Sequence, residues 1–315
     1  MNANIQERKP VAIQQIRDNL YLIDIDQALE GFRKFISAWL YRVNGATLLV
    51  DPGPASTIPY LVERLKQAGV DRVDHVLLTH IHLDHAGGTG QLLQHFPDAK
   101  VNCHPKGIAH MVAPQRLWEE SKKVLGKVAE AYGEMAPVPE SGISFRERID
   151  LGGAFIEVTE TPGHAPHHVS YRVGEILFAG EIGGVYVPLD DGFYVRPATP
   201  PPFRHETFRE SIAKAAGLDV SLVCLGHYGC REDGAALFER ARRQLDFWVD
   251  TVERHFRKGS DPFEEAVLAD LIANDPDMSR WPSLPKDIQA RERYFCFNSI
   301  RGIRMYLAQE EGKKV

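Results

Sequence analysis

The sequence predicts an α/β body over about residues 1–234, followed by an all-helical C-terminal extension over 235–315. Two observations support the α/β body. Short apolar runs alternate with segments of helical spacing in the first half of the chain, and strand-like runs return over about 154–225. A third supports the extension, because from residue 235 onward the apolar residues recur three and four positions apart. We therefore expect two domains that divide near residue 234.

The first part of the chain is expected to alternate strands and helices. Strands are predicted over 19–25 and 36–50, and the second contains the hairpin signal Asn44-Gly45 between two apolar runs. An Asp-Pro-Gly turn then ends this run, and capping the turn is a sufficient role for Asp51. The elements predicted next are helices over 56–69 and 89–96 and strands over 75–79 and 99–103.

A helical insertion interrupts this alternation over about 105–145, where the apolar spacing predicts one helix over 115–133. Residues 183–205 are expected to form a long loop, and a stripe from Phe238 to Phe256 predicts a helix in the extension. The remaining predicted elements are strands over 154–159, 168–173, 175–179 and 220–225 and helices over 206–216, 263–273 and 287–308.

Length and composition narrow the class of protein. The chain has 315 residues, enough for a full core, and its net charge of −6 comes from interspersed acidic and basic residues. We therefore expect a small-molecule substrate, no nucleic-acid or membrane partner, and a homodimer as an open option. The N-terminus, Met1 to Pro10, is polar and lacks a secretion signal, and the four cysteines show no C-x-x-C spacing. A cytoplasmic protein with reduced cysteines is expected.

The chemistry is concentrated in one short motif directly after the apolar run Val76-Leu77-Leu78. Its members are three imidazoles and one carboxylate within six residues: His80, His82, Asp84 and His85. Residues two apart on an extended backbone project to the same side, and a Gly-Gly pair at 87–88 lets the backbone fold tightly behind them. Neutral imidazole with carboxylate is the ligand set that suits zinc or ferrous iron. The motif predicts a metal site.

Further candidate ligands occur where other predicted strands end. His164 follows the strand 154–159 in the turn Thr161-Pro162-Gly163, Glu181 follows the strand 175–179, and His227 follows the strand 220–225. His168 is expected to orient a strand or a metal ligand. Tyr228, beside His227, is a candidate to donate a hydrogen bond to a substrate oxygen, although packing would account for it equally well.

The H-x-H-x-D-H motif resembles the signature of the metallo-β-lactamase superfamily, including the Gly-Gly that follows it. The T-P-G-H and G-H elements at 161–164 and 226–227 resemble that family's further ligand elements, in the same order, so that the resemblance covers about residues 18–230. It implies the four-layer αββα sandwich, with two sheets face to face, helices outside, and metals at one edge between them. Position by position, it implies a first metal site of His80, His82 and His164 and a second of Asp84, His85 and His227, with Glu181 bridging.

Glu181 departs from the family pattern, in which the bridging residue is Asp. The carboxylate is kept, but one additional methylene moves its oxygens outward, whereas site geometry is normally held within about 0.5 Å. Three alternatives stay open: the backbone retreats to compensate, the bridging is asymmetric, or only one metal binds firmly.

The resemblance implies two divalent ions as cofactors, with zinc expected first and iron or manganese as alternatives. Two such ions about 3.5–4 Å apart can hold a hydroxide at neutral pH, and Asp84 would be the catalytic residue that relays its proton. The expected reaction is hydrolysis of an ester-type bond: a thioester, a lactone, another acyl ester or a phosphodiester. The glyoxalase II and acyl-homoserine lactonase branches of the superfamily suggest the first two.

Specificity must come from outside the metal ligands. We take Tyr228 and two residues of the loop 183–205, Tyr194 and Arg196, as candidate substrate contacts. Two other functional classes remain: an iron-dependent redox enzyme on the same scaffold, and a metal-binding regulatory protein whose site Glu181 has detuned.

Overall fold

The structure is a computed structural model that describes residues 13–312 and divides into two compact units, residues 1–145 and 146–315. The N-terminal segment discussed above, Met1 to Pro10, lies outside the described residues. The predicted domain boundary near residue 234 stays a prediction. Within residues 13–312, no helix is both long and apolar enough to cross a membrane. The cytoplasmic location also stays a prediction.

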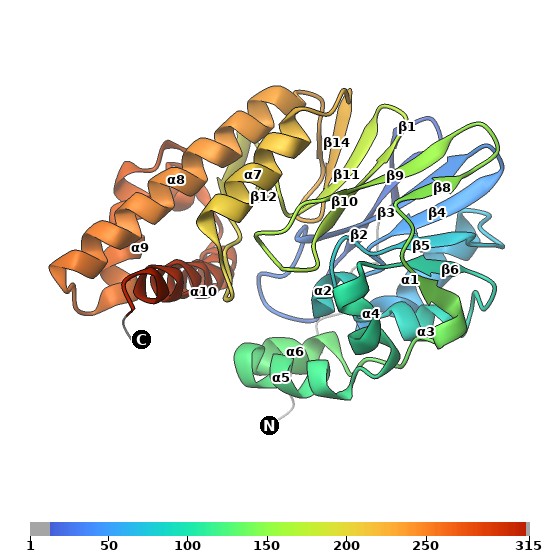
Figure 1. The fold of residues 1–315 in the computed structure, drawn as a ribbon, viewed down its shortest axis with the longest axis horizontal. Coiled ribbons are helices and arrows are strands. Elements are labelled where there is room, and N and C mark those ends of the chain that lie inside the picture. Colours follow the sequence, from blue (N-terminus) through green and yellow to red (C-terminus); the bar gives the residue numbers. More distant parts are fainter. Residues whose placement is uncertain (1–12, 313–315) are drawn as a thin grey trace. The chain divides into compact units, whose positions relative to one another are not determined.

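The first unit is built on a seven-stranded sheet in which the strands follow their sequence order from β1 to β7. Figure 1 labels the first six of them. The first four strands are antiparallel: β1 (Ile13–Arg17), β2 (Leu20–Ile25), β3 (Ile36–Val43) and β4 (Ala46–Val50). The other three run parallel: β5 (His75–Leu77), β6 (Lys100–Asn102) and β7 (Ile143–Ser144). The predicted hairpin at Asn44-Gly45 is confirmed, with φ values of 49° and 79°.

The helices of the first unit are α1 (Ile58–Gln67), α2 (Leu83–Ala86), α3 (Thr89–Leu93), α4 (Pro105–Val112), α5 (Gln115–Leu125) and α6 (Lys127–Tyr132). The prediction of one helix over 115–133 was wrong. The helix is interrupted at Gly126, whose φ is +54°, and the preceding Val124 is 65% exposed rather than part of an apolar stripe. In this unit, the strands β1 and β7 were not predicted from the sequence; in the second unit, the short strands at Arg148–Asp150 and Cys230–Arg231 were also missed.

The second unit contains a six-stranded sheet in the order β15-β14-β11-β10-β9-β8, whose strands from β14 to β8 run across Figure 1 in that order. Only the pairing of β11 with β14 is parallel, and it contains a register shift between Phe178 and Gly180. The strands are β8 (Arg148–Asp150), β9 (Phe155–Glu160), β10 (Val169–Val173), β11 (Ile176–Gly180), β14 (Leu222–Leu225) and β15 (Cys230–Arg231).

A long loop was predicted over residues 183–205, but part of this segment is strand. It contains an antiparallel hairpin of β12 (Val185–Leu189) and β13 (Gly192–Arg196). Valine and aromatic side chains favour strands, and they flank a turn at Asp190-Asp191. Tyr186 and Tyr194 of this hairpin are buried in the core of the unit, and this tertiary burial stabilises the strands.

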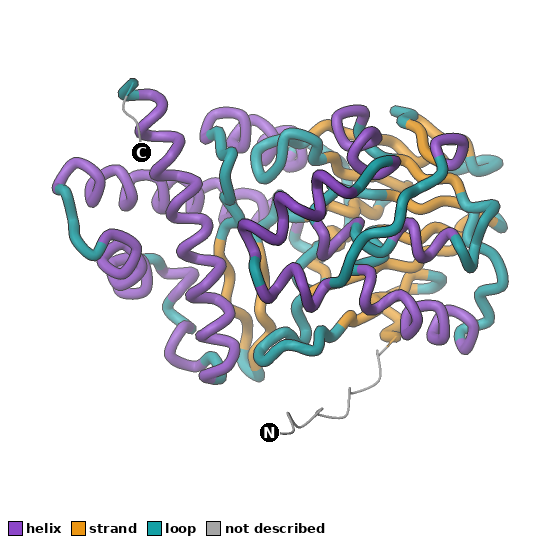
Figure 2. The backbone as a smooth tube through the Cα atoms, turned by 90° about the horizontal axis from the view of Figure 1, so that it is seen from below, coloured by secondary structure: helices purple, strands orange, loops and turns teal. Residues whose placement is uncertain are grey.

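The helices of the second unit are α7 (His205–Ala216), α8 (Gly234–Lys258), α9 (Phe263–Asn274) and α10 (Lys286–Glu310). The predicted stripe on α8 is confirmed, since Leu245, Trp248 and Val252 are fully buried. In Figure 1, α8 runs beside α7, and in Figure 2 the C-terminal region forms a group of purple helices. These helices share one hydrophobic core with β11–β14.

A buried carboxylate ties this helical region together. Asp275 Oδ2 accepts hydrogen bonds from Gln244 Nε2 at 2.8 Å and from Trp248 Nε1 at 2.9 Å, and Asp277 N donates to Asp275 Oδ1. Gln244 also donates to the carbonyl of Val195, at the end of β13. Helix α8 is therefore connected by hydrogen bonds both to the loop after α9 and to the β12–β13 hairpin.

Candidate metal site

In the first unit, the predicted motif forms a compact group of imidazoles at the end of β5. The ring centroids of His80 and His82 are 4.6 Å apart, and those of His80 and His85 are 4.4 Å apart. His80 and His85 are buried, whereas His82 and Asp84 are partly exposed. Asp84 Oδ2 lies 3.7 Å from His85 Nε2. The local chain thus brings all four predicted ligands of this unit together.

Asp51 orients these imidazoles through hydrogen bonds, a role that was not predicted from the sequence. Its Oδ1 accepts the backbone N–H of Thr79 at 2.8 Å, and its Oδ2 accepts the Thr79 hydroxyl at 2.6 Å. The hydroxyl therefore accepts from His80 Nδ1, 3.0 Å away, which leaves His80 Nε2 with the lone pair that binds a metal. His85 Nδ1 also lies 3.3 Å from Asp51 Oδ2.

Pairing of neighbouring strands explains how Asp51 reaches this position. Val50 at the end of β4 is paired with Leu77 at the end of β5 in parallel register, so the residues that follow them lie side by side. Asp51, His80 and His85 together offer ligand atoms within 4.8 Å of one another. Both oxygens of Asp51 are bonded to Thr79, which suits an orienting carboxylate.

The Gly-Gly pair packs the motif against the turn that carries Asp51. Gly88 N donates to Gly53 O at 2.8 Å, and Gly53 N donates to His85 O at 2.9 Å. A Cβ at Gly88 would lie 2.3 Å from Cδ1 of Ile58, closer than any side chain tolerates. The predicted tight backbone fold behind the ligands is confirmed at this glycine.

In the second unit, three predicted ligands meet around one carboxylate. Glu181 Oε2 lies 2.6 Å from His164 Nε2, and Glu181 Oε1 lies 3.4 Å from His227 Nε2. All three side chains are buried. His164 Nδ1 donates to the carbonyl of Ala198 at 3.1 Å, so Nε2, which faces Glu181, is the ring nitrogen available to a metal. This hydrogen bond carries no sequence signal because its acceptor is a backbone group.

His168 holds the backbone of Glu181, in agreement with the orienting role expected for it. Glu181 N donates to His168 Nε2 at 3.2 Å, so the proton of this neutral imidazole sits on Nδ1 and is donated to Thr161 Oγ1 at 2.9 Å. The Thr161 hydroxyl donates in turn to Ser170 Oγ, and Ser170 donates to the carbonyl of Ala179. This series of hydrogen bonds ends at Ala179, two residues before Glu181, whose backbone His168 holds.

Each unit therefore presents a buried set of donors that fits a divalent metal. The Nδ1 atoms of His80 and His164 are engaged by oxygen acceptors, and their Nε2 atoms are left as the ligating nitrogens. In the second unit, the Nε2 atoms of His164 and His227 face one carboxylate in a buried setting, where a cation would neutralise its charge. The chemistry of both sets suits zinc, iron or manganese.

Two of the three residues proposed to contact substrate are enclosed in the second unit. Arg196 is 2% exposed and its Nε donates to Glu292 Oε2 at 2.6 Å, while Tyr194 is 0% exposed with its hydroxyl 3.6 Å from Cys296 Sγ. This burial argues against the predicted substrate contact and gives both side chains a structural role. Tyr228 is partly exposed beside His227 and keeps the predicted role.

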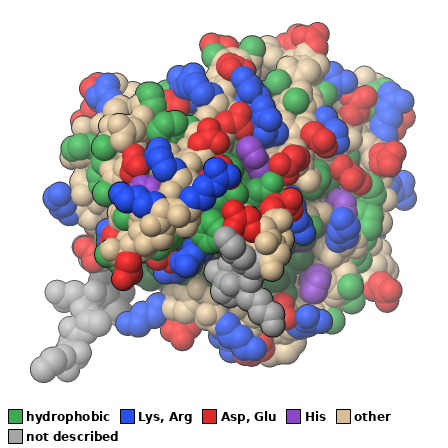
Figure 3. Space-filling view, turned by 60° about the vertical axis from the view of Figure 1, so that its left-hand side comes forward, with side chains coloured by type: hydrophobic (Ala, Val, Ile, Leu, Met, Phe, Trp, Pro, Cys, Tyr) green, Lys and Arg blue, Asp and Glu red, His purple; other side chains and the backbone are tan. Residues whose placement is uncertain are grey.

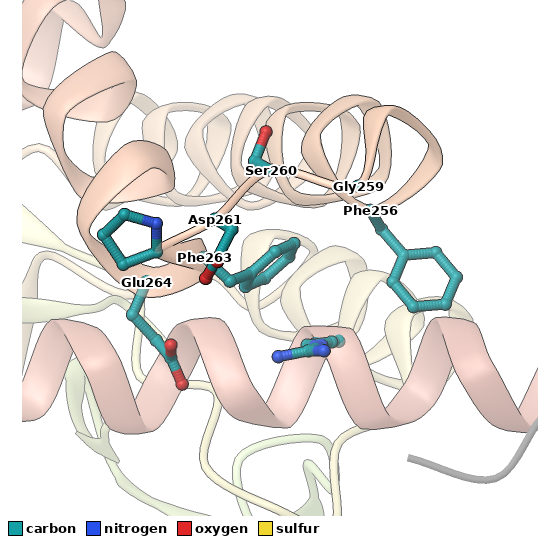
Figure 4. A pocket seen from close by; sticks show the side chains of 8 residues that line it. Phe256, Gly259, Ser260, Asp261, Phe263 and Glu264 are labelled. Carbon is teal, nitrogen blue, oxygen red and sulfur yellow. The ribbon is translucent and has the colours of Figure 1, made fainter.

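One cavity of the second unit contains none of the predicted ligands. It has a volume of about 440 Å³ and is lined by α8, α9, α10 and the loop between α8 and α9, including Phe256, Phe263 and Arg304 (Figure 4). Ser260, on its wall, contacts His255 Nδ1, whose Nε2 lies 2.8 Å from Asp270. Ser260 N also donates to His255 O, so this contact closes the end of α8.

Comparison with known proteins gives relatives of one family. A sequence profile described as "Metallo-beta-lactamase superfamily" matches residues 31–227, a span that includes every predicted metal ligand. The metallo-beta-lactamase fold-containing protein of Sulfurisphaera tokodaii is 30% identical over 190 residues, covering 58% of this chain and 69% of that protein. The hydroxyacylglutathione hydrolase of Aeromonas hydrophila is 33% identical over 144 residues, 45% of this chain and 44% of the enzyme. This chain thus matches less than half the length of that hydrolase.

A solved structure confirms the predicted fold. The crystal structure of an archaeal metallo-beta-lactamase superfamily protein from Sulfolobus tokodaii superimposes with a TM-score of 0.69 at 22% identity, covering 91% of this chain and 98% of that one. The likeness includes the C-terminal helical region, since so much of both chains is covered. With the profile match across more than half of its length, the chain belongs to the metallo-β-lactamase superfamily.

Proposed function

We propose that this protein is a metal-dependent hydrolase that cleaves ester-type bonds, with thioesters as the first substrate class. In this proposal, the ligands of two divalent ions are His80, His82, Asp84, His85, His164, Glu181 and His227. The observation that carries the proposal is that each unit holds its share of these ligands already oriented around buried nitrogen and carboxylate donors. All seven lie within the span matched by the family profile.

The bound ions would supply an activated water molecule and neutralise the negative charge that develops on the substrate. Asp84 is partly exposed beside His85, so its carboxylate can accept a proton from the attacking water and pass it to the leaving group. Asp51, through Thr79, keeps His80 in one tautomer and one ring orientation. Tyr228, next to His227 in the sequence, would donate a hydrogen bond to a substrate oxygen.

Similarity to hydroxyacylglutathione hydrolases supports the choice of a thioester, because the bond that those enzymes cleave joins an acyl group to sulfur. The helical C-terminal region, reminiscent of the glyoxalase II branch, adds to this support. Lactones, other acyl esters and phosphodiesters are alternative substrates for the same metal ligands. For all of these, the small molecule is the proposed partner of the site.

A substrate panel tests the proposal. The metal-loaded protein is assayed with an S-acyl glutathione, an N-acyl homoserine lactone, a p-nitrophenyl ester and a phosphodiester, beside the variants His80→Ala and His95→Ala. His95 is an exposed histidine on the same unit and serves as the matched control. We expect thioester turnover that His80→Ala abolishes and His95→Ala retains. Metal binding with no turnover of any substrate would contradict the proposal and favour a regulatory protein, and oxygen consumption with iron alone would favour a redox enzyme.

A further inference from the structure

We propose that helix α10 acts as a positioning element for the metal ligand His164, through the segment Arg196–Thr199. The inference rests on the proposed metal site, and it assigns Thr199 and Ser299 as positioning residues for it. All the contacts that carry it lie within the second unit. It gives the C-terminal helical region a function at the site, beyond adding to the hydrophobic core.

The first step is the hydrogen bond that orients His164. Its Nδ1 donates to the carbonyl oxygen of Ala198 at 3.1 Å, and its Nε2 faces Glu181. Ala198 lies beyond the end of β13 and before the start of α7, where no strand pairing holds the backbone. The orientation of this ligand therefore depends on what fixes residue 198.

The second step is a double hydrogen bond between the neighbour of Ala198 and α10. Thr199 N donates to Ser299 Oγ at 3.2 Å, and Thr199 Oγ1 donates to the carbonyl of Ser299, also at 3.2 Å. Both residues are buried. The contact needs Gly302 one turn further along α10, because a Cβ there would lie 1.9 Å from the Thr199 carbonyl oxygen. The segment and the helix touch backbone to backbone.

The third step is a buried ion-pair cluster on the other side of Ala198. Arg196 donates through Nε to Glu292 Oε2 at 2.6 Å, and Arg291 lies 2.9 Å from Glu292 Oε1. Glu292 and Arg291 belong to α10, so residues 196 and 199 are both bonded to this helix. The carbonyl of Ala198 lies between two anchored residues and is held in place for the imidazole.

A protein group that orients a metal-binding histidine typically changes metal affinity by 10- to 100-fold when it is removed. Here Thr199 and Ser299 act one contact further from the metal, so we expect an effect near the lower end of this range. Because α10 bonds to the segment at two places, loss of one hydrogen bond loosens the Ala198 carbonyl without releasing the helix.

Conservative variants of the full-length protein test the inference. Thr199→Val and Ser299→Ala each remove one of the two hydrogen bonds, and Tyr306→Phe is the matched control. Tyr306 also lies on α10, but its hydroxyl donates to Glu206 of α7 at 2.8 Å and not to the segment 196–199. Zinc affinity is measured by competition with a chelator, stability by urea unfolding, and the His164 Nδ1–H hydrogen bond from the imidazole ¹H and ¹⁵N shifts of the zinc-loaded protein.

We expect Thr199→Val and Ser299→Ala to weaken zinc binding about tenfold and to change the shift of the His164 Nδ1–H proton, because its hydrogen bond to Ala198 is loosened. Tyr306→Phe should leave both readouts unchanged, whatever it does to stability. Wild-type affinity and Nδ1–H shift in both test variants, or losses of affinity that merely follow stability in all three, would overturn the inference while leaving the metal site intact. A wild-type protein that binds no zinc would overturn the proposed function itself, and the inference with it.

Discussion

At the scale of single residues, the account depends on histidines whose ligating nitrogens are oriented in advance. His80→Ala or His164→Ala removes one such nitrogen, and we expect each variant to lose tightly bound metal and hydrolysis together. Metal content by elemental analysis, with His95→Ala as the control on an exposed histidine, checks this expectation. Full retention of metal in both variants would show that the ligand assignment is wrong.

Asp51 provides a second prediction at this scale. In Asp51→Asn, the side chain can accept from Thr79 through only one oxygen, so the His80 tautomer is no longer fixed. We expect zinc affinity to fall about 10- to 100-fold. Asp74→Asn is the matched control, since Asp74 also accepts a backbone N–H, from Thr47, but contacts no predicted ligand in the described residues. Equal effects of the two variants on affinity would leave Asp51 with only the turn-capping role that the sequence suggested.

Glu181 provides a third prediction at the scale of single residues. Its two oxygens already face His164 and His227, and the β11–β14 pairing shifts register just before it. These observations favour the alternative in which the backbone compensates for the longer side chain. Glu181→Asp would then withdraw the carboxylate by about 1.5 Å, one carbon–carbon bond, and we expect the metal content to fall. A rise in metal content would instead show that the additional methylene is a defect of the site.

The predicted ligands were within reach of sequence reasoning because each stands in a short motif at the end of a strand. The groups that orient these ligands were not predictable from the sequence. Asp51 acts on His80 only because β4 and β5 are parallel neighbours, and the acceptor for His164 is the carbonyl of Ala198, which any residue could supply. Arg196 was misjudged because a basic residue in an assumed loop suggests a ligand contact, whereas its partner Glu292 is 96 positions away.

At the scale of elements, the buried pairing of β13 with α10 makes a prediction about stability. Burial alone would raise the pKa of the Glu292 carboxyl, but the guanidinium groups of Arg196 and Arg291 hold this pKa below its ordinary value of 4.5. Glu292→Gln leaves both guanidinium groups without their countercharge. We expect it to lower the free energy of unfolding by about 3–5 kcal/mol at neutral pH, as measured by urea unfolding.

The difference in unfolding free energy between the wild type and Glu292→Gln should depend on pH in a definite direction. Because the pKa of Glu292 is lower in the folded than in the unfolded protein, its stabilising contribution is fully present above about pH 4.5 and is lost as the pH falls through the folded pKa. The gap in stability between wild type and Glu292→Gln should therefore narrow only below pH 4.5. Arg301→Gln is a control, since its exposed pair with Glu264 should contribute little. A gap that stays constant down to the acid transition would contradict the ion-pair account.

Elements whose sequence signals are local could be predicted, and elements that depend on distant residues could not. The hairpin at Asn44-Gly45 and the apolar stripe on α8 can each be recognised from a short stretch of neighbouring residues, and both were predicted. The break at Gly126 is a local feature that was overlooked, since this glycine has a positive φ. The hairpin β12–β13 depends on tertiary packing: Tyr186 and Tyr194 are stabilised by a core that the C-terminal helices complete, and no local pattern reveals this.

At the scale of the whole molecule, the family match extends over parts of both units. Residues 31–227 match the family profile, and this span crosses the division at residue 145. On the face drawn in Figure 3, acidic and basic side chains are interspersed, as the sequence composition suggested. Recognition of the substrate is therefore expected to depend on side chains close to the metal ligands, such as Tyr228.

We propose that one chain uses two metal ions to hydrolyse a thioester. The most direct test of this proposal is a titration of the metal-stripped protein with zinc, in which bound metal and hydrolysis of an S-acyl glutathione are measured in the same samples. The account predicts turnover that rises with bound zinc and levels off at about two equivalents per chain. Saturation at one equivalent, or two bound equivalents without turnover, would contradict it.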